Sequence, residues 1–128
     1  MATVALDLLG GGGAPGVVAD AIARLCGPES SQPGSPDPAD LIVVGPAAVA
    51  RELLVERGVD PDRVRIVDAG RGASMAGNPL SMLRAHDDVT VTVAVGLVNA
   101  GLADAWVSVG HTGAAVAAAV LGLGRLSG

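Results

Sequence analysis

The chain has 128 residues, of which 50% are hydrophobic and 16% are charged, and its formal net charge is −5. An intrinsically disordered chain is excluded, because the sequence holds ample apolar material for one domain with a single core. All eight basic residues are Arg and they form no cluster, so nucleic acid is not an expected partner. Phe and Tyr are absent and Trp106 is the only aromatic residue, so Val, Leu, Ile and Ala must build the core.

Cysteine usage and hydropathy predict a reducing compartment and no membrane span. Cys26 is the only cysteine, which excludes an internal disulfide and a zinc site with paired cysteines, and leaves a packing role for this residue. The first three residues carry no basic side chain, so no signal peptide is expected. The most apolar stretch, 113–124, is too short to cross a bilayer. These features predict a cytoplasmic protein without a metal ion.

The first half of the chain alternates strand and helix patterns. The apolar run 3–9 predicts a strand that ends at a Gly-rich loop, and apolar residues at helical spacing from Pro15 to Leu25 predict a helix. Residues 27–39 contain four Pro and no periodic apolar residue, so they predict a flexible surface connection. A buried strand at 41–44 and an amphipathic helix at 47–57 are expected to follow.

The second half continues this alternation. Residues 63–67 alternate in polarity, as expected of a strand near a sheet edge, and 68–78 is expected to be a loop. A fourth strand is predicted at 103–108 and an Ala- and Val-rich helix at 112–126. Strands and helices in this order form right-handed βαβ units. The sequence therefore predicts one α/β domain over 1–128, a three-layer αβα sandwich with a mostly parallel, Rossmann-like sheet.

The segment 89–95 gives conflicting signals. Its alternating Val and Thr residues have the period of a strand, whereas the βαβ order requires a crossover helix between the third and fourth strands.

Two loops are candidate binding sites, because ligands of parallel sheets bind at the carboxyl ends of the strands. The first loop is 7–15 and the second is 108–114, and each joins a strand to a helix. Backbone N–H groups at such helix starts can hold a phosphate group. The alternative is that the glycines serve only tight turns.

Side chains in these loops suggest further roles. Gly11, Gly13 and Gly16 match a dinucleotide fingerprint, but the second strand does not end in the acid that would bind a ribose, so a nucleotide-binding protein is the less favoured interpretation. Ser108 lacks the Gly-x-Ser-x-Gly context of a hydrolase nucleophile and is better suited to donate a hydrogen bond to an anion. His111 is either a general acid or base or an ordinary loop histidine.

Taken together, the two loops, with Met75 and Pro79 between them, resemble the N-terminal part of the phosphate acyltransferase family of bacterial phospholipid synthesis. Residues 7–15, Asp-Leu-Leu-Gly-Gly-Gly-Gly-Ala-Pro, are similar to the family's Asp-x-x-Gly-Gly-Asp-x-Ala-Pro motif. Residues 103–114, Ala-Asp-Ala-Trp-Val-Ser-Val-Gly-His-Thr-Gly-Ala, are similar to its Ala-Asp-Ala-Phe-Val-Ser-Ala-Gly-Asn-Thr-Gly-Ala. The resemblance covers nearly the whole chain, and it favours a helix over the strand pattern at 89–101.

Members of this family move a fatty acyl group from acyl carrier protein to inorganic phosphate, which gives an acyl phosphate for phospholipid synthesis. The resemblance thus implies an acyltransferase without a cofactor, and it implies a homodimer that associates peripherally with membranes. Our own hypothesis is that His111, which stands where the family motif has Asn, is a catalytic residue that stabilises an oxyanion. The residues implied to bind phosphate and substrate lie in the two loops or on the segment between them: Asp7, Gly10, Gly11, Ala14, Pro15, Arg84, Ser108, Gly110, Thr112 and Gly113.

The chain also departs from the family pattern. Gly12 stands where the family has an acid, and residues 86–90 replace a stretch with two Lys, while Arg84 is retained. Family members continue well beyond Gly128, so this chain resembles a fragment or a degenerate copy. An inactive domain that keeps a binding role is therefore the alternative to an acyltransferase.

Overall fold

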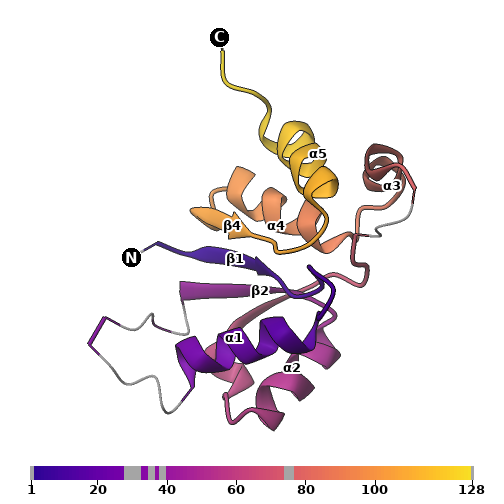
Figure 1. The fold of residues 1–128 in the computed structure, drawn as a ribbon. Helices are drawn as coiled ribbons and strands as arrows, with labels where there is room; N and C mark the ends of the chain where they lie inside the picture. The colour runs from indigo at the N-terminus through magenta and orange to yellow at the C-terminus, as the bar shows by residue number, and fades with distance from the viewer. Residues whose placement is uncertain (1, 28–32, 35–36, 38–39, 74–76, 128) are drawn as a thin grey trace.

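A computed structural model describes residues 2–27, 33–34, 37, 40–73 and 77–127 of the chain. In these residues, four short strands form one parallel sheet in the order β3-β2-β1-β4 (Figure 1). Val4 of β1 pairs with Leu41 of β2 on one side and with Ala105 of β4 on the other. The strands are β1 Val4–Asp7, β2 Leu41–Gly45, β3 Arg65–Asp68 and β4 Ala105–Val107. The helices are α1 Gly16–Cys26, α2 Ala47–Glu56, α3 Pro79–Ala85, α4 Thr90–Asn99 and α5 Thr112–Leu123, with a short 3-10 helix at Pro61–Arg63.

The sheet lies between two helical layers, with α1 and α2 on one face and α4 and α5 on the other (Figure 1). Leu8, Ile22 and Leu54 lie in the apolar cluster under α1 and α2, and Ala5 and Val44 lie in a cluster on the opposite face. The three-layer αβα prediction is confirmed. The expectation of a single core is wrong, because the buried apolar residues form three clusters: one under α1 and α2, one between the sheet and α4, and one among α3, α4 and α5.

The Val- and Thr-rich segment is helical, as the family resemblance predicts and its local pattern does not. Thr90, Val91, Ala94 and Val95 are all buried and recur on one face of α4. That face packs on the sheet and against α5. Burial on a helical face outweighs the strand propensity of these residues.

Several element boundaries differ from the sequence prediction. The strands are shorter, with β1 ending at Asp7 and β4 beginning at Ala105. The last helix ends at Leu123 instead of Leu126, because Gly124 has a φ of +79°. Most of the predicted connection at 27–39 lies outside the described residues, as does Met75.

Helix α3 was not predicted at all, although its start carries a clear signal. Pro79 occupies the first turn, and the Asn78 side chain accepts hydrogen bonds from the backbone N–H groups of Leu80 and Ser81. This is an ordinary capped helix start. In the part of the chain that the structure describes, no helix is long and apolar enough to cross a membrane.

Candidate functional site

The two predicted loops lie side by side because β1 and β4 are neighbours in the sheet. Leu6 pairs with Val107, so Asp7 and Ser108 leave the sheet at the same edge. The Ser108 hydroxyl donates a hydrogen bond to Asp7 Oδ2 at 2.8 Å. Residues that are far apart in sequence thus form one site at the carboxyl ends of the strands, where parallel sheets bind their ligands.

Asp7 is a buried anchor of this site, with 2% of its surface exposed. Its Oδ1 accepts a hydrogen bond from the Leu9 backbone N–H at 3.0 Å, while its Oδ2 accepts from Ser108. Ser108 Oγ in turn accepts from the Gly110 backbone N–H at 3.3 Å. A serine hydroxyl has one proton to donate, and here Asp7 receives it. The arrangement therefore orders both loops, and in this geometry Ser108 does not offer its proton to an anion.

Glycine is required where the two loops meet. A Cβ on Gly10 would lie 2.9 Å from Ser108 Oγ, and a Cβ on Gly110 would lie 3.0 Å from the Gly10 Cα. Gly11 has a φ of +93°, and a Cβ there would lie 3.0 Å from the Val109 carbonyl oxygen. The close approach of the two backbones thus depends on missing side chains.

Helix α5 begins at this site and presents N–H groups to it. His111 Nδ1 accepts a hydrogen bond from the Ala114 backbone N–H at 3.2 Å, so this side chain caps the helix. Among the described residues, the N–H groups of Thr112 and Gly113 have no acceptor. Unpaired N–H groups and the helix dipole make such an end favourable for an anion. The capping role of His111 was not anticipated, and because Nδ1 accepts, the neutral ring carries its proton on Nε2.

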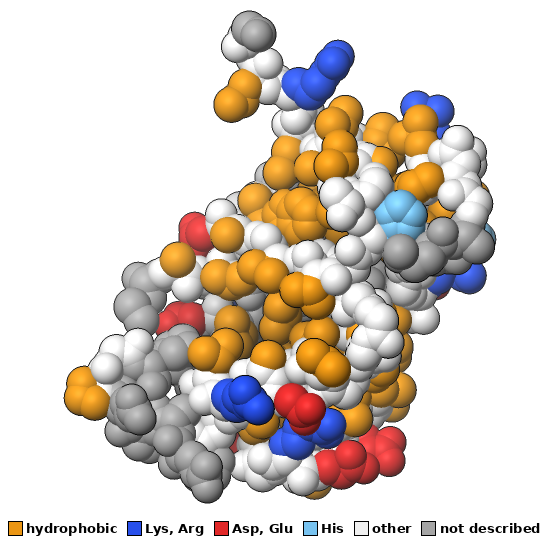
Figure 2. Space-filling view, viewed as in Figure 1, with side chains coloured by type: hydrophobic (Ala, Val, Ile, Leu, Met, Phe, Trp, Pro, Cys, Tyr) orange, Lys and Arg blue, Asp and Glu red, His pale blue; other side chains and the backbone are white. Residues whose placement is uncertain are grey.

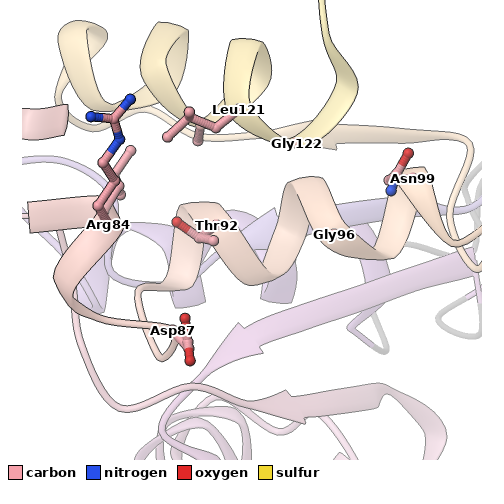
Figure 3. Close-up of a pocket in the computed structure, with 9 residues that line it drawn as sticks. Arg84, Asp87, Thr92, Gly96, Asn99, Leu121 and Gly122 are labelled. Carbon is pink, nitrogen blue, oxygen red and sulfur yellow. The ribbon is translucent and has the colours of Figure 1, made fainter.

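The remaining predicted residues lie at three places around this site. Ala14 packs against the apolar cluster under α1 and α2, and Pro15 precedes the first turn of α1 without a side-chain hydrogen bond. Helix α3 starts beside the loops, since a Cβ on Gly113 would lie 3.4 Å from Pro79 Cγ. Arg84, near the end of α3, lines a separate pocket between α4 and α5 (Figure 3). The structure therefore brings Asp7, the loop glycines and Ser108 together, and it places Arg84 elsewhere.

Metal and thiol chemistry have little support in the described parts of the chain. No group of three or more His, Cys, Asp or Glu side chains there is arranged to hold a metal ion. Cys26 is buried at the end of α1, and burial, with a smaller contribution from the negative charge of Asp37, raises the pKa of its thiol. A protonated, inaccessible thiol is a weak nucleophile.

Comparison with known proteins relates the whole chain to one family. A family model described as "Fatty acid synthesis protein" matches residues 2–128. The phosphate acyltransferase of Thermosynechococcus vestitus is 39% identical over 128 residues, which are 99% of this chain and 34% of that protein. The phosphate acyltransferase of Desulfitobacterium hafniense (strain Y51) is 36% identical over 128 residues, covering 100% of this chain and 36% of that protein. The phosphate acyltransferase of Syntrophomonas wolfei is 32% identical over 126 residues, which are 98% of this chain and 37% of that protein.

The chain therefore spans about a third of the length of these curated relatives. The matched region includes both loops and every helix and strand of the fold. The resemblance to phosphate acyltransferases is thus confirmed along the chain. The chain belongs to the fatty acid synthesis protein family, whose model matches its residues 2–128.

Proposed function

We propose that this chain supplies the phosphate-binding part of a phosphate acyltransferase that moves a fatty acyl group from acyl carrier protein to inorganic phosphate. The supporting observation is the joined pair of loops, held by the hydrogen bond between Ser108 and Asp7. Beside them lie the N–H groups of Thr112 and Gly113, which have no acceptor among the described residues. A phosphate bound there accepts hydrogen bonds from these N–H groups and from the exposed Thr112 hydroxyl. The glycines allow the ligand to approach the backbone closely.

In the proposed reaction, a phosphate oxygen forms a bond to the acyl carbonyl carbon. The carbon–sulfur bond of the thioester breaks, and the sulfur leaves as a thiolate that takes up a proton. Negative charge develops on the carbonyl oxygen during the attack. The proton on His111 Nε2 is available for a hydrogen bond to that oxygen, because Nδ1 is occupied by the Ala114 N–H.

The proposal also includes a second copy of the chain and an association with membranes. Helix α5 exposes aliphatic side chains to solvent, and Figure 2 shows hydrophobic side chains spread over the face on which α5 lies. The exposed fractions are 58% for Val116, 42% for Val120 and 49% for Leu121. Such a surface suits a homodimer contact or a lipid surface. The cytoplasmic location predicted from the sequence is retained as part of the proposal.

Acyl-phosphate formation tests the proposal directly. We expect the isolated chain to be inactive, because a net charge of −5 repels an acidic carrier protein and one anion site cannot also position the acyl arm. We expect activity when the remaining two-thirds of the Thermosynechococcus vestitus relative is added in trans. Turnover by the chain alone would contradict the need for a second part. Inactivity of the chain both alone and after addition of the rest of the relative would favour the alternative of an inactive binding domain.

A further inference from the structure

The two edges of the sheet differ in their chemistry. At one edge, β3 begins with Arg65 and ends with Asp68, and both charged residues are exposed. Charged residues on an outer strand discourage pairing with a further strand. At the other edge, β4 consists of Ala105, Trp106 and Val107 and carries no charge. The β4 edge therefore lacks the charged protection that the β3 edge has.

Backbone groups of Trp106 face this free edge. The N–H of Ala105 donates a hydrogen bond to the carbonyl oxygen of Thr3, which lies on the β1 side. Consecutive residues of a strand direct their N–H and C=O groups to opposite sides, so those of Trp106 point away from β1. Among the described residues β4 has no second neighbouring strand, because it is the last strand of the sheet. The edge is thus free to pair with one more strand.

Helix α5, which follows β4, is apolar around its whole circumference. It contains no charged side chain, and Thr112 at its start is its only polar one. The exposed sides of α1 and α2 carry charged residues such as Asp20 and Arg51, whereas that of α5 carries Val116 and Val120. A helix that is apolar all round is normally buried. The exposed side of α5 therefore lacks the cover that its composition calls for.

Helix α5 extends past the last strand of the sheet. In Figure 1 it lies on the far side of β4 from β1. Trp106 is the only residue of the sheet in the described cluster among α3, α4 and α5. A helix that connects two parallel strands packs back onto the sheet beside the strands that it joins. The described part of the sheet therefore offers α5 only one of two such strands.

The direction of α5 predicts where a further strand lies. Near the starts of the two helices, Ala114 of α5 clusters with Val91 of α4. Further along, a Cβ on Gly122 would touch Val95, so α5 runs beside α4 in the same direction. Helix α4 leads from β3 to the start of β4, across the sheet. A right-handed connection through α5, on the same face, continues in that direction and places the next strand parallel to β4 at its free edge.

We propose that the β4 edge and the exposed side of α5 together bind a parallel strand from the remaining part of a phosphate acyltransferase. This choice of occupant rests on the proposed function. The matched region is 34% of one relative and 36% of another, so most of each relative is available to supply the strand.

The free edge favours this occupant over two others that suit the apolar side of α5 alone. A lipid surface covers apolar side chains but offers no aligned partners to the backbone groups of Trp106. A second copy related by a two-fold axis brings the same edge of both chains together, and the two β4 strands then pair antiparallel. The direction of α5 requires a parallel strand instead.

Hydrogen exchange of the isolated chain and of a chimera tests this inference. In the chimera, the chain replaces the matched third of the Thermosynechococcus vestitus phosphate acyltransferase. The peptide 102–109, which contains β4, is expected to keep more amide protons in the chimera, with the Trp106 amide exchanging at least about tenfold more slowly. The peptide 63–68, which contains β3, is the internal control, and its exchange is expected to be unchanged.

Two matched substitutions test the α5 side of the surface. Val116 on α5 is 58% exposed in this chain, and Val55 on α2 is 61% exposed. Val116→Glu should lower the melting temperature of the chimera and leave that of the isolated chain nearly unchanged, because the carboxylate is buried only when α5 is covered. Val55→Glu should leave both nearly unchanged. Equal responses of the chimera to the two substitutions would contradict the inference.

Unchanged exchange of the peptide 102–109 in a folded chimera would overturn the inference. If the chimera does not fold, exchange in the intact relative decides: slow exchange of its segment aligned with 102–109 supports the inference, and rapid exchange overturns it. Protection of β4 in the isolated chain that is lost on dilution would identify a second copy as the occupant. Protection gained only with anionic vesicles would identify a lipid surface, and either result overturns the inference.

Acyl-phosphate formation by the chimera separates this inference from the proposed function. A protected β4 edge without turnover contradicts only the proposed function. Turnover with an unprotected β4 edge contradicts only the inference about the edge.

Discussion

The Ser108 hydroxyl donates a hydrogen bond at 2.8 Å to the carboxylate of Asp7, a residue 101 positions earlier in the chain. This bond joins the loop after β1 to the loop after β4, and its acceptor Asp7 is buried while its donor Ser108 is half-buried. Asp7 has no cation among its described partners, so its carboxylate is stabilised by hydrogen bonds from the Leu9 N–H and the Ser108 hydroxyl. The bond therefore sets the relative position of the two loops.

A double-mutant cycle on this pair measures its contribution. Ser108→Ala removes a hydrogen bond to a charged group and is expected to lower the free energy of unfolding by roughly 1.5–3 kcal/mol. The Asp7→Ala and Ser108→Ala effects should be coupled by about 0.5–3 kcal/mol in urea unfolding. Asp20→Ala is the control, because the Asp20 carboxylate pairs with Arg57 at the exposed surface and exposed pairs contribute about 0–1 kcal/mol. Strict additivity of the two site variants would show that the bond does not hold the loops.

Two glycines in one loop are expected to respond in opposite ways to the same change. Gly10→Ala places a Cβ 2.9 Å from Ser108 Oγ, and the resulting overpacking should destabilise the fold by about 1–3 kcal/mol. Gly12→Ala meets no described atom within 4 Å and should leave the unfolding midpoint unchanged or slightly higher. Equal effects of the two variants on thermal unfolding would contradict the close approach of the loops.

The capping and catalytic roles of His111 can be separated by two substitutions. His111→Ala removes the acceptor of the Ala114 N–H and should lower the free energy of unfolding by about 0.5–2 kcal/mol. His111→Asp keeps a capping acceptor and should restore stability. In the complemented acyltransferase assay, His111→Asp should remain slow despite its restored stability, because a carboxylate has no proton to donate to the oxyanion. Full activity of His111→Asp would limit this residue to capping.

Folding stability at alkaline pH is expected to depend on Cys26. Burial raises the pKa of this thiol in the folded state, so the folded chain keeps the proton at pH values where the unfolded chain releases it. Stability should therefore be constant below the unfolded pKa and fall as the pH rises through the folded pKa. The chain has neither Tyr nor Lys, so few other groups titrate in this window. Urea unfolding of Cys26→Ala across the same pH range should show a flatter profile, and an equally steep decline would assign the effect to another group.

The sequence predicts the fold well where burial and local pattern agree. Residues 41–45 are buried throughout, and their unbroken apolar run predicts this central strand. At 90–99 the local pattern favours a strand, and only the βαβ order and the family resemblance predict the helix. Helix α3 has a single buried residue, Leu83, so its apolar periodicity is too weak to reveal it.

The position of the candidate site was predictable, but its internal geometry was not. Gly-rich loops after strands indicate the carboxyl edge of the sheet. That Ser108 gives its proton to Asp7 depends on β1 and β4 being neighbours, and no local pattern contains this pairing. The location of Arg84 depends likewise on α3, which separates this residue from the loops that the resemblance groups with it.

Phosphate binding by the two loops is the central claim, and an amide spectrum of the ¹⁵N-labelled chain tests it most directly. Increasing phosphate, with chloride at matched ionic strength as the reference, should shift the Gly11, Thr112 and Gly113 amide signals along one saturable curve. Gly58, which follows α2, should not move. Shifts that are absent, unsaturable or equal in chloride would contradict the proposed phosphate site.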